Sequence, residues 1–187
     1  MKSRRILFAV SSLSAGGAER VIAELANAFA GRGHAVAVLT LVRSDADQYR
    51  LDDRVERIAL DIIWESTSIW QSVIGNIRRS LMIRRAVQAF GPDIVISFIE
   101  QTNVRMLAAL PASGTPVVVS ERVDPRRYRI GRSWILARRI LYPLAAKVVV
   151  QTEVVALWAK NIVAAGRIHV IPNFVRDLPA PPPVATR

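Results

Sequence analysis

Short apolar runs alternate with longer segments of helical period along most of this chain, and this alternation is its most constraining feature. The apolar runs cover 6–10, 35–41, 55–60, 94–98, 116–120, 147–151 and 168–171. Predicted helices lie between them, at 18–30, 68–90, 103–110, 134–144 and 154–164. Strands that alternate with helices indicate a parallel sheet covered on both faces. The sequence therefore predicts an α/β fold built on a doubly wound, mostly parallel, Rossmann-like sheet.

A chain of 187 residues is long enough to bury the core of one domain, to which we assign residues 1–175. Residues 176–187 include a Pro-Ala-Pro-Pro-Pro run, which favours an extended linker. The basic N-terminus precedes an apolar run that is too short for a secretory signal and that leads into serines. No apolar stretch approaches the roughly 18 to 20 residues that cross a bilayer.

The formal charge is +11, and arginine supplies almost all of the positive charge. Such a balance favours an anionic partner, which can be nucleic acid, an acidic membrane or a phosphorylated substrate, unless it reflects compositional bias alone. Nucleic acid is disfavoured because no helix-turn-helix, RRM or KH signature is found and aromatic residues do not interleave with the basic ones. Without cysteine, and with two histidines far apart, we expect neither disulfides nor a metal site.

Ligands of doubly wound sheets bind beyond the carboxyl ends of the strands, which here precede segments 11–17, 98–103, 120–132 and 151–152. The first of these contains Gly16 and Gly17, just before a predicted helix. Their spacing fits neither the dinucleotide fingerprint nor the P-loop, which disfavours NAD and ATP. The pair either lets a ligand approach the helix N-terminus or only forms a tight turn. Glu19 either contacts the same ligand or is only a favourable acid in the first turn of the helix.

Five short motifs, taken in order, resemble those of the N-terminal domain of family-4 GT-B glycosyltransferases. They are GGAERV at 16–21, GRGHAV at 31–36, DIVISF at 93–98, KVVVQT at 147–152 and VIPN at 170–173. Phe174 stands where the family commonly has a second proline. Each motif is loose, but their order and spacing from Arg5 to Asn173 are fairly specific. The resemblance implies one half of a GT-B fold.

Residues 120–125, Ser-Glu-Arg-Val-Asp-Pro, stand where many members have a histidine, and they resemble the branch that extends glycans on polyprenyl-diphosphate carriers. The family's donor-binding half, with its basic pair and E-x7-E motif, is not found here, so we expect the chain alone to be an incomplete enzyme. The resemblance implies a retaining transferase at the cytoplasmic side, peripheral to the inner face of the plasma membrane. It implies a nucleotide-sugar donor (UDP- or GDP-linked), a lipid-linked glycan acceptor, and neither cofactor nor metal.

The resemblance also suggests roles for individual residues. Gly16 and Gly17 would lie near the donor diphosphate. Glu121 is the candidate that orients the acceptor hydroxyl, unless it is a strand-end glutamate paired with Arg122 or Arg126. The other residues expected to bind the acceptor are Ser14, Glu19, Thr102, Asn103, Ser120, Arg122 and Asp124.

Arginines form a second candidate feature. Arg126, Arg127, Arg129 and Arg132 precede an apolar, Trp-containing segment and suit a lipid diphosphate or an anionic leaflet, where each charge adds on the order of 1 kcal/mol. The run at 78–85 is more simply a solvated helix face. Two other functions stay open at this point: a non-catalytic module that binds a glycolipid or anionic membrane and, with less support, a nucleic-acid-binding protein.

Overall fold

The computed structural model describes residues 2–62, 69–111, 114–128 and 130–173, with Ala46 and residues 69–74 described by their backbone alone. Within them, seven strands form one sheet in the order β3-β2-β1-β4-β5-β6-β7. The strands are β1 (Arg5–Val10), β2 (Ala35–Thr40), β3 (Val55–Ala59), β4 (Ile94–Phe98), β5 (Val117–Ser120), β6 (Lys147–Val150) and β7 (Ile168–Val170). All neighbouring pairs are parallel, which confirms the predicted sheet.

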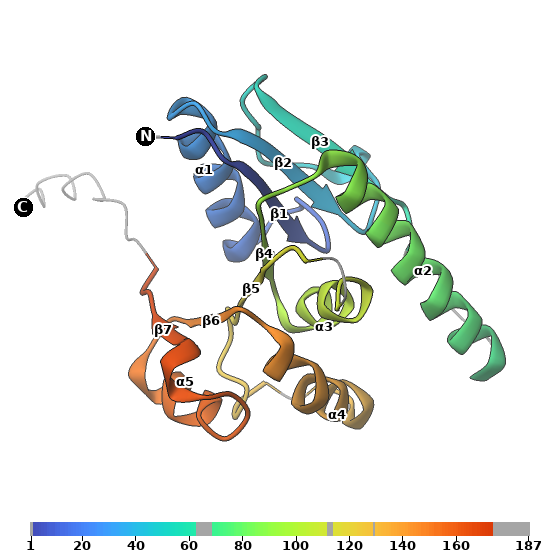
Figure 1. Ribbon diagram of the computed structural model, residues 1–187, viewed down its shortest axis with the longest axis vertical. Helices are drawn as coiled ribbons and strands as arrows, with labels where there is room; N and C mark the ends of the chain where they lie inside the picture. Colours follow the sequence, from blue (N-terminus) through green and yellow to red (C-terminus); the bar gives the residue numbers. More distant parts are fainter. Residues whose placement is uncertain (1, 63–68, 112–113, 129, 174–187) are drawn as a thin grey trace, which may run out of the picture.

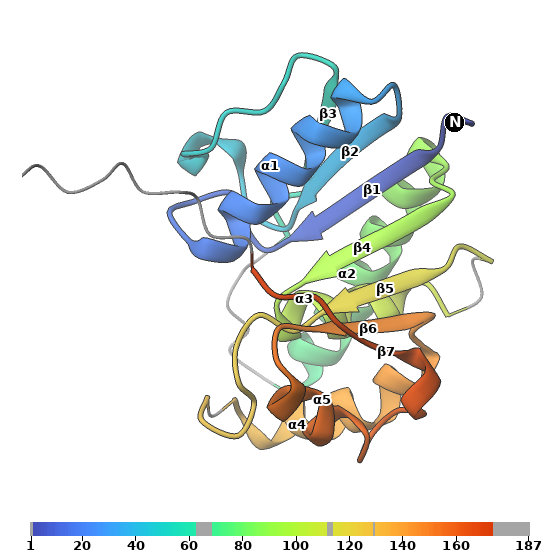
Figure 2. The same ribbon diagram turned by 90° about the vertical axis from the view of Figure 1, so that its left-hand side faces the viewer.

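Helices lie on both faces of this sheet (Figures 1 and 2). The first, α1 (Gly17–Gly31), packs on one face, beside β1 and β2. The other four are α2 (Ile69–Phe90), α3 (Glu100–Ala109), α4 (Arg132–Leu141) and α5 (Glu153–Ala159), and they contribute to the core of the opposite face. Short 3-10 turns occur at η1 (Ser44–Ala46), η2 (Tyr142–Leu144) and η3 (Ala165–Arg167).

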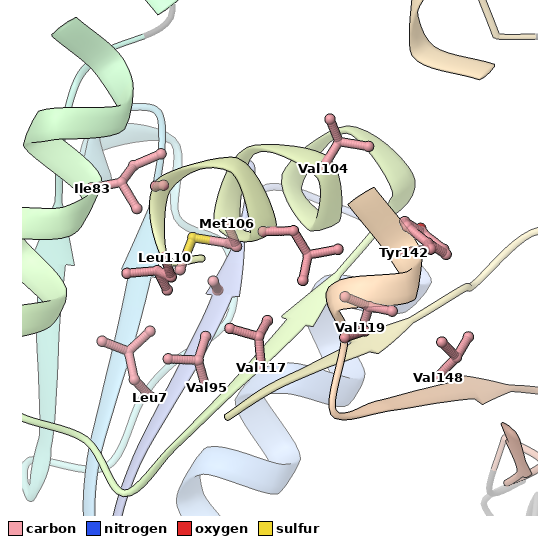
Figure 3. Packing of buried hydrophobic residues seen from close by; sticks show 14 of the residues in the cluster. Leu7, Ile83, Val95, Val104, Met106, Leu110, Val117, Val119, Tyr142 and Val148 are labelled. Carbon is pink, nitrogen blue, oxygen red and sulfur yellow. The ribbon is translucent and has the colours of Figure 1, made fainter. Parts of the chain in front are cut away.

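Two apolar clusters, one on each side of the sheet, form the core. In β1, Phe8 packs with Ile22 of α1, whereas its neighbour Leu7 packs in the cluster that contains Ile83 of α2 and Met106 of α3 (Figure 3). All five side chains are fully buried. Successive residues of a strand point to opposite faces, so an unbroken apolar run such as 6–10 can supply both clusters.

Two helices differ from the predicted ranges. Helix α3 begins at Glu100 rather than at 103, because Ile99 turns the chain sharply at the end of β4 and accepts a hydrogen bond from Asn103 N–H. Helix α5 ends at Ala159 rather than at 164. A tight turn follows, in which the N–H groups of Ile162 and Val163 both bond to the Ala159 carbonyl, and it brings the Val163 side chain into the core.

The apolar residues of α2 do not all face the core. Ile83, Val87 and Phe90 face the core, whereas Ile77 and Leu81 are 57% and 50% exposed. At 3.6 residues per turn, Ile77 and Leu81 lie on the side of the helix opposite the core-facing stripe. The side chains of Trp70, Val73 and Ile74 lie outside the described residues, as do Ser68 and the predicted linker 176–187.

Candidate functional site

The order of the strands identifies the site. Strands β1 and β4 are neighbours in the sheet; β2 and β3 follow on the side of β1, and β5, β6 and β7 follow on the side of β4. The connections that leave β1 and β4 therefore pass to opposite faces of the sheet. Figure 2 shows their carboxyl ends side by side, where α1 and α3 begin. Ligands of open α/β sheets bind at such a switch point.

The turn after β1 is held in place by contacts with the β2–β3 connection. The Tyr49 hydroxyl donates to the Gly16 carbonyl at 2.9 Å and accepts from the Gly16 N–H at 3.3 Å. A Cβ on Gly16 would come within 2.1 Å of a Glu19 carboxylate oxygen, so the Glu19 side chain lies directly over this glycine. At Gly17 a Cβ would meet no atom within 4 Å. The turn is therefore packed at Gly16 and open at Gly17.

The junction after β4 is strained. Ile99 has a φ of 70° and a ψ of 136°, a conformation that is unfavourable for a β-branched residue. Two hydrogen bonds hold it: its N–H donates to the Ser120 carbonyl at 3.2 Å, and its carbonyl accepts from Asn103 N–H at 2.9 Å. Such strain persists where surrounding contacts over-determine the backbone, and it clusters at ligand sites.

A cavity of about 380 Å³ opens between these two junctions. It is lined by Gly17, Ala18, Glu19, Ile99, Glu100, Arg122, Val123, Tyr128, Gln151 and Asn173. Four separate connections contribute, all at the carboxyl edge of the sheet. The volume is within the range of small-molecule sites.

The cavity carries both signs of charge. Arg122 lies over the Phe98 ring, with its guanidinium carbon 5.2 Å from the centroid, and it donates to the Asn173 side-chain oxygen. Burial lowers the pKa of Arg122. Glu100 is 4% exposed, and in the described part of the chain its carboxylate has neither a hydrogen bond nor an ion pair. A carboxylate without a partner beside a fixed guanidinium suits a polar ligand with several hydroxyls.

Behind the cavity lies a buried polar network centred on Glu121. The Tyr142 hydroxyl donates to Glu121 Oε1 at 2.5 Å, and Arg138 Nη1 lies 3.4 Å from the same oxygen. Asn103 Nδ2 donates to the Tyr142 hydroxyl and to the Ser120 carbonyl, both at 3.1 Å. Burial raises the pKa of Glu121, against the opposing effects of the Tyr142 hydrogen bond and the Arg138 charge.

Glu121 is thus paired with Arg138, and not with Arg122 or Arg126 as the sequence suggested. Its side chain is fully buried, so in this conformation it reaches no external hydroxyl. Several buried polar atoms of this region have no partner among the described residues: Ser97 Oγ, Thr102 Oγ1, Asn103 Oδ1, Ser120 Oγ, Glu121 Oε2 and Arg138 Nε. Such a concentration is typical of a region that binds ordered water.

In the loop after β5, Arg126 is held by a neighbouring acid. Arg126 donates from Nε and Nη2 to the Asp124 carboxylate, at 3.0 and 2.8 Å. These bonds lower the pKa of Asp124 to about 2. Arg127 and Arg132 are exposed, and Arg132 is the first residue of α4. Arg129 lies outside the described residues.

The cavity unites three of the residues singled out from the sequence, namely Gly17, Glu19 and Arg122. The other candidates do not line it: Gly16 lies beneath Glu19, Ser14 bonds to Ser12, Asp124 pairs with Arg126, and Thr102, Asn103, Ser120 and Glu121 are buried.

Sequence reasoning did not single out Ile99, Glu100, Tyr128, Gln151 or Asn173, although the first four lie in the segments 98–103, 120–132 and 151–152 that it assigned to ligand binding. Most of them lie in the segments that follow strand ends, so position relative to the strands was the available signal.

Two further structural facts concern the described residues only. They hold no group of three or more His, Asp or Glu side chains placed to bind a metal ion. None of their helices has the length and apolar character needed to cross a membrane.

Comparison with known proteins begins with a curated relative in Campylobacter jejuni, GalNAc-alpha-(1->4)-GalNAc-alpha-(1->3)-diNAcBac-PP-undecaprenol alpha-1,4-N-acetyl-D-galactosaminyltransferase. It is 28% identical over 139 residues, which cover 74% of this chain and 38% of the relative. The match therefore covers well under half the length of that protein.

Solved glycosyltransferase structures share the fold. The lipopolysaccharide outer core galactosyltransferase WaaB superposes with a TM-score of 0.71 at 15% identity, over 98% of this chain and 50% of WaaB. Anabaena HepE in complex with UDP-glucose gives a TM-score of 0.66 at 17% identity, over 92% of this chain and 44% of HepE. The α/β sheet is thus the Rossmann-like half of a GT-B fold.

The model of Glycosyltransferase Family 4 matches residues 15–177, from the glycine turn after β1 to beyond β7. The match includes every residue that lines the switch-point cavity. The chain belongs to Glycosyltransferase Family 4.

Proposed function

We propose that this chain is the acceptor-side domain of a retaining glycosyltransferase that moves a sugar from a nucleotide-sugar to a lipid-linked glycan. The observation that carries the proposal is the cavity at the β1/β4 switch point, which combines a helix N-terminus, two acids and a fixed arginine. Family membership supports transferase chemistry at this site. The name of the Campylobacter relative, which includes an undecaprenol-PP-linked glycan, supports the acceptor class.

The donor would approach along the open side of Gly17. The first N–H groups of a helix have no partner within it, and with the helix dipole they stabilise negative charge that develops on a leaving diphosphate. Glu19 restricts where an anion can bind, because its carboxylate lies over Gly16 and repels an anion placed there. The diphosphate would therefore lie on the Gly17 side, while Glu19 accepts a hydroxyl of a sugar. We propose a nucleotide-sugar, UDP- or GDP-linked, as the donor, and no further cofactor; HepE, which shares the fold, is solved in complex with UDP-glucose.

The acceptor glycan would occupy the side of the cavity formed by Glu100, Arg122 and Tyr128. A partnerless carboxylate and a guanidinium offer an acceptor and donors to sugar hydroxyls. Glu121 would act indirectly, by holding the start of the loop that carries Arg122. This role replaces direct orientation of the hydroxyl, for which a fully buried side chain is poorly placed.

The carrier lipid would place the protein at the cytoplasmic face of a membrane, as a peripheral protein. Arg127 and Arg132, both exposed beside the cavity loop, would meet the anionic surface or the carrier diphosphate. Arg126 would contribute less, since its guanidinium is already bound to Asp124. We infer that this chain alone has no turnover, because it spans about half or less of the relatives it matches.

The test is binding of the 187-residue chain to nanodiscs with and without a polyprenyl-diphosphate glycan. Wild type should bind the loaded discs more tightly, and Arg122→Gln should remove the preference for the glycan. Arg32→Gln, an exposed arginine at the end of α1, is the matched control for charge and should keep it. Equal binding to loaded and empty discs would refute an acceptor site in this chain.

A non-catalytic module that binds a glycolipid is the second candidate, because the residues that line the switch-point cavity can bind a glycan without transferring a sugar to it. It gives the same binding result but a different outcome with donor. Addition of a nucleotide-sugar together with a separately supplied donor-binding half should start transfer if the proposed function holds, and should leave the glycan unchanged if the chain is a binding module.

A further inference from the structure

Each of the two helices that begin at the switch point carries a glutamate in its first turn. Glu19 lies in the first turn of α1, and Glu100 is the first residue of α3. Both line the switch-point cavity, since the carboxyl ends of the paired strands β1 and β4 place the two helix starts beside each other (Figure 2). The unpaired N–H groups of a first helical turn favour a negative charge, and here the protein supplies that charge itself. An anionic ligand therefore has to compete with the protein's own acids.

Glu100 has no positively charged partner in the described part of the chain, although its side chain is buried. The buried Arg138 is paired with Glu121 instead. In addition to burial, the charge of Glu100 raises the pKa of Glu121, so the two carboxyl groups disfavour each other's ionised form. A buried carboxylate without a partner is unfavourable, and a further negative charge beside it increases this cost.

The cavity as a whole carries more negative than positive charge. Its described lining residues include two acids and one base, Arg122. The Arg122 guanidinium lies over the Phe98 ring and donates to Asn173, both of which are neutral, and one guanidinium cannot neutralise two carboxylates. The net charge of the chain, in contrast, is +11. The overall charge and the local charge of the cavity therefore predict opposite preferences for an acidic glycan.

We propose that the acceptor side of the switch-point cavity selects an uncharged sugar and excludes a sugar that carries a carboxylate, with Glu100 as the residue that determines this selectivity. The inference rests on the proposed function, because it places the acceptor glycan beside Glu100. Hydroxyl groups of a neutral sugar donate to the Glu100 carboxylate and supply the partner that it lacks. A sugar carboxylate has no proton to donate at neutral pH, and it brings another negative charge to the same place. Such discrimination works by repulsion of the wrong ligand.

The experiment measures binding of the 187-residue chain, at physiological salt, to nanodiscs that carry one of three polyprenyl-diphosphate disaccharides. They end in glucose, in glucuronic acid or in the methyl ester of glucuronic acid, which resembles the acid in shape but has no charge. Wild type should bind the ester about as tightly as the glucose glycan, and the acid about tenfold or more weakly than the ester. Glu100→Gln should reduce the difference between acid and ester to about threefold or less. Glu56→Gln, which removes the same charge at an exposed position of β3, should leave it unchanged.

Each alternative has its own result. Equal or tighter binding of the acid would overturn the inference, and loss of that binding in Arg122→Gln would assign the carboxylate to Arg122. An ester that binds as weakly as the acid would show selection by size, and an unchanged difference in Glu100→Gln would remove the role of Glu100. If Glu100→Gln fails to fold by circular dichroism, the comparison of acid and ester in wild type decides. If none of the three glycans binds better than the carrier alone, the acceptor site of the proposed function fails and this inference fails with it.

Discussion

Glu121→Gln should remove a pH dependence of stability that the buried carboxyl group imposes. Within the described residues, only one Glu121 oxygen has partners, and the other is buried without any. Burial therefore disfavours the ionised form, and the folded-state pKa lies above the ordinary value of 4.5. The unfolded chain exposes the group to water and restores the ordinary value.

The sign of the effect follows from proton binding. Between the ordinary pKa and the raised one, the folded protein holds more protons than the unfolded chain, so the free energy of unfolding falls as pH rises. One group gives a slope of at most about 1.4 kcal/mol per pH unit. The stabilisation from Glu121 is fully present below pH 4.5 and is lost as pH rises through the folded pKa. Asp124 acts in the opposite direction, but only below its ordinary value of 3.8.

Urea unfolding of wild type and Glu121→Gln, followed from below pH 4.5 to neutrality, isolates this group because all others cancel in the difference. Glutamine keeps an oxygen that accepts from Tyr142, so the variant should fold. The free energy of unfolding of wild type minus that of the variant should fall as pH rises. Glu56→Gln, at an exposed position of β3, is the matched control and should leave the pH profile of wild type unchanged. A difference that stays flat or rises with pH would refute the reasoning.

Three further predictions concern stability and can be checked by the same urea titrations. Tyr142→Phe should cost roughly 1–3 kcal/mol, because it leaves the Glu121 carboxyl group and the Asn103 amide buried without this hydroxyl as a partner; a loss below about 0.5 kcal/mol, on the order of a surface change, would contradict this. Gly16→Ala should destabilise wild type more than it destabilises a Glu19→Ala variant, because the new Cβ competes with the Glu19 carboxylate; equal costs in the two backgrounds would show that the carboxylate does not lie there. Ile99→Gly should be more stable than Ile99→Ala by about 1 kcal/mol, the reverse of the usual order, because only glycine relieves a φ of 70°.

Sequence reasoning was most reliable for the sheet. Apolar runs such as 36–39 and 148–150 coincide with strands, since a strand covered on both faces needs apolar residues throughout. It was less informative for α2, where Ile77 and Leu81 form one apolar stripe and the buried Ile83, Val87 and Phe90 form another. Only packing against α3 decides which of those stripes meets the core. The sequence also did not indicate that α3 begins at Glu100, because this start depends on the unusual backbone of Ile99.

The sequence predicted where the site lies, but not which residues pair with one another in it. Gly17, Glu19 and Arg122 follow strand ends, and the rule for open sheets places ligands there. The pairing of Glu121 with Arg138 spans 17 residues and requires α4 to dock beside β5, which no local pattern encodes. The contact of Arg122 with Asn173 depends in the same way on the chain's return after β7.

The pairing of β1 with β4 has a consequence for synthesis. Ile6 aligns with Ile94, so the two central strands meet only after more than half of the chain has been made. Closing so long a loop is entropically costly, and contacts of this kind slow folding. The part of the cavity wall that Asn173 forms is synthesised later still. At a ribosomal rate of about 5–20 residues per second, the nascent chain passes several seconds in which α1 can exist and its binding cavity cannot. A ligand of this cavity therefore cannot stabilise the chain before Asn173 has been made.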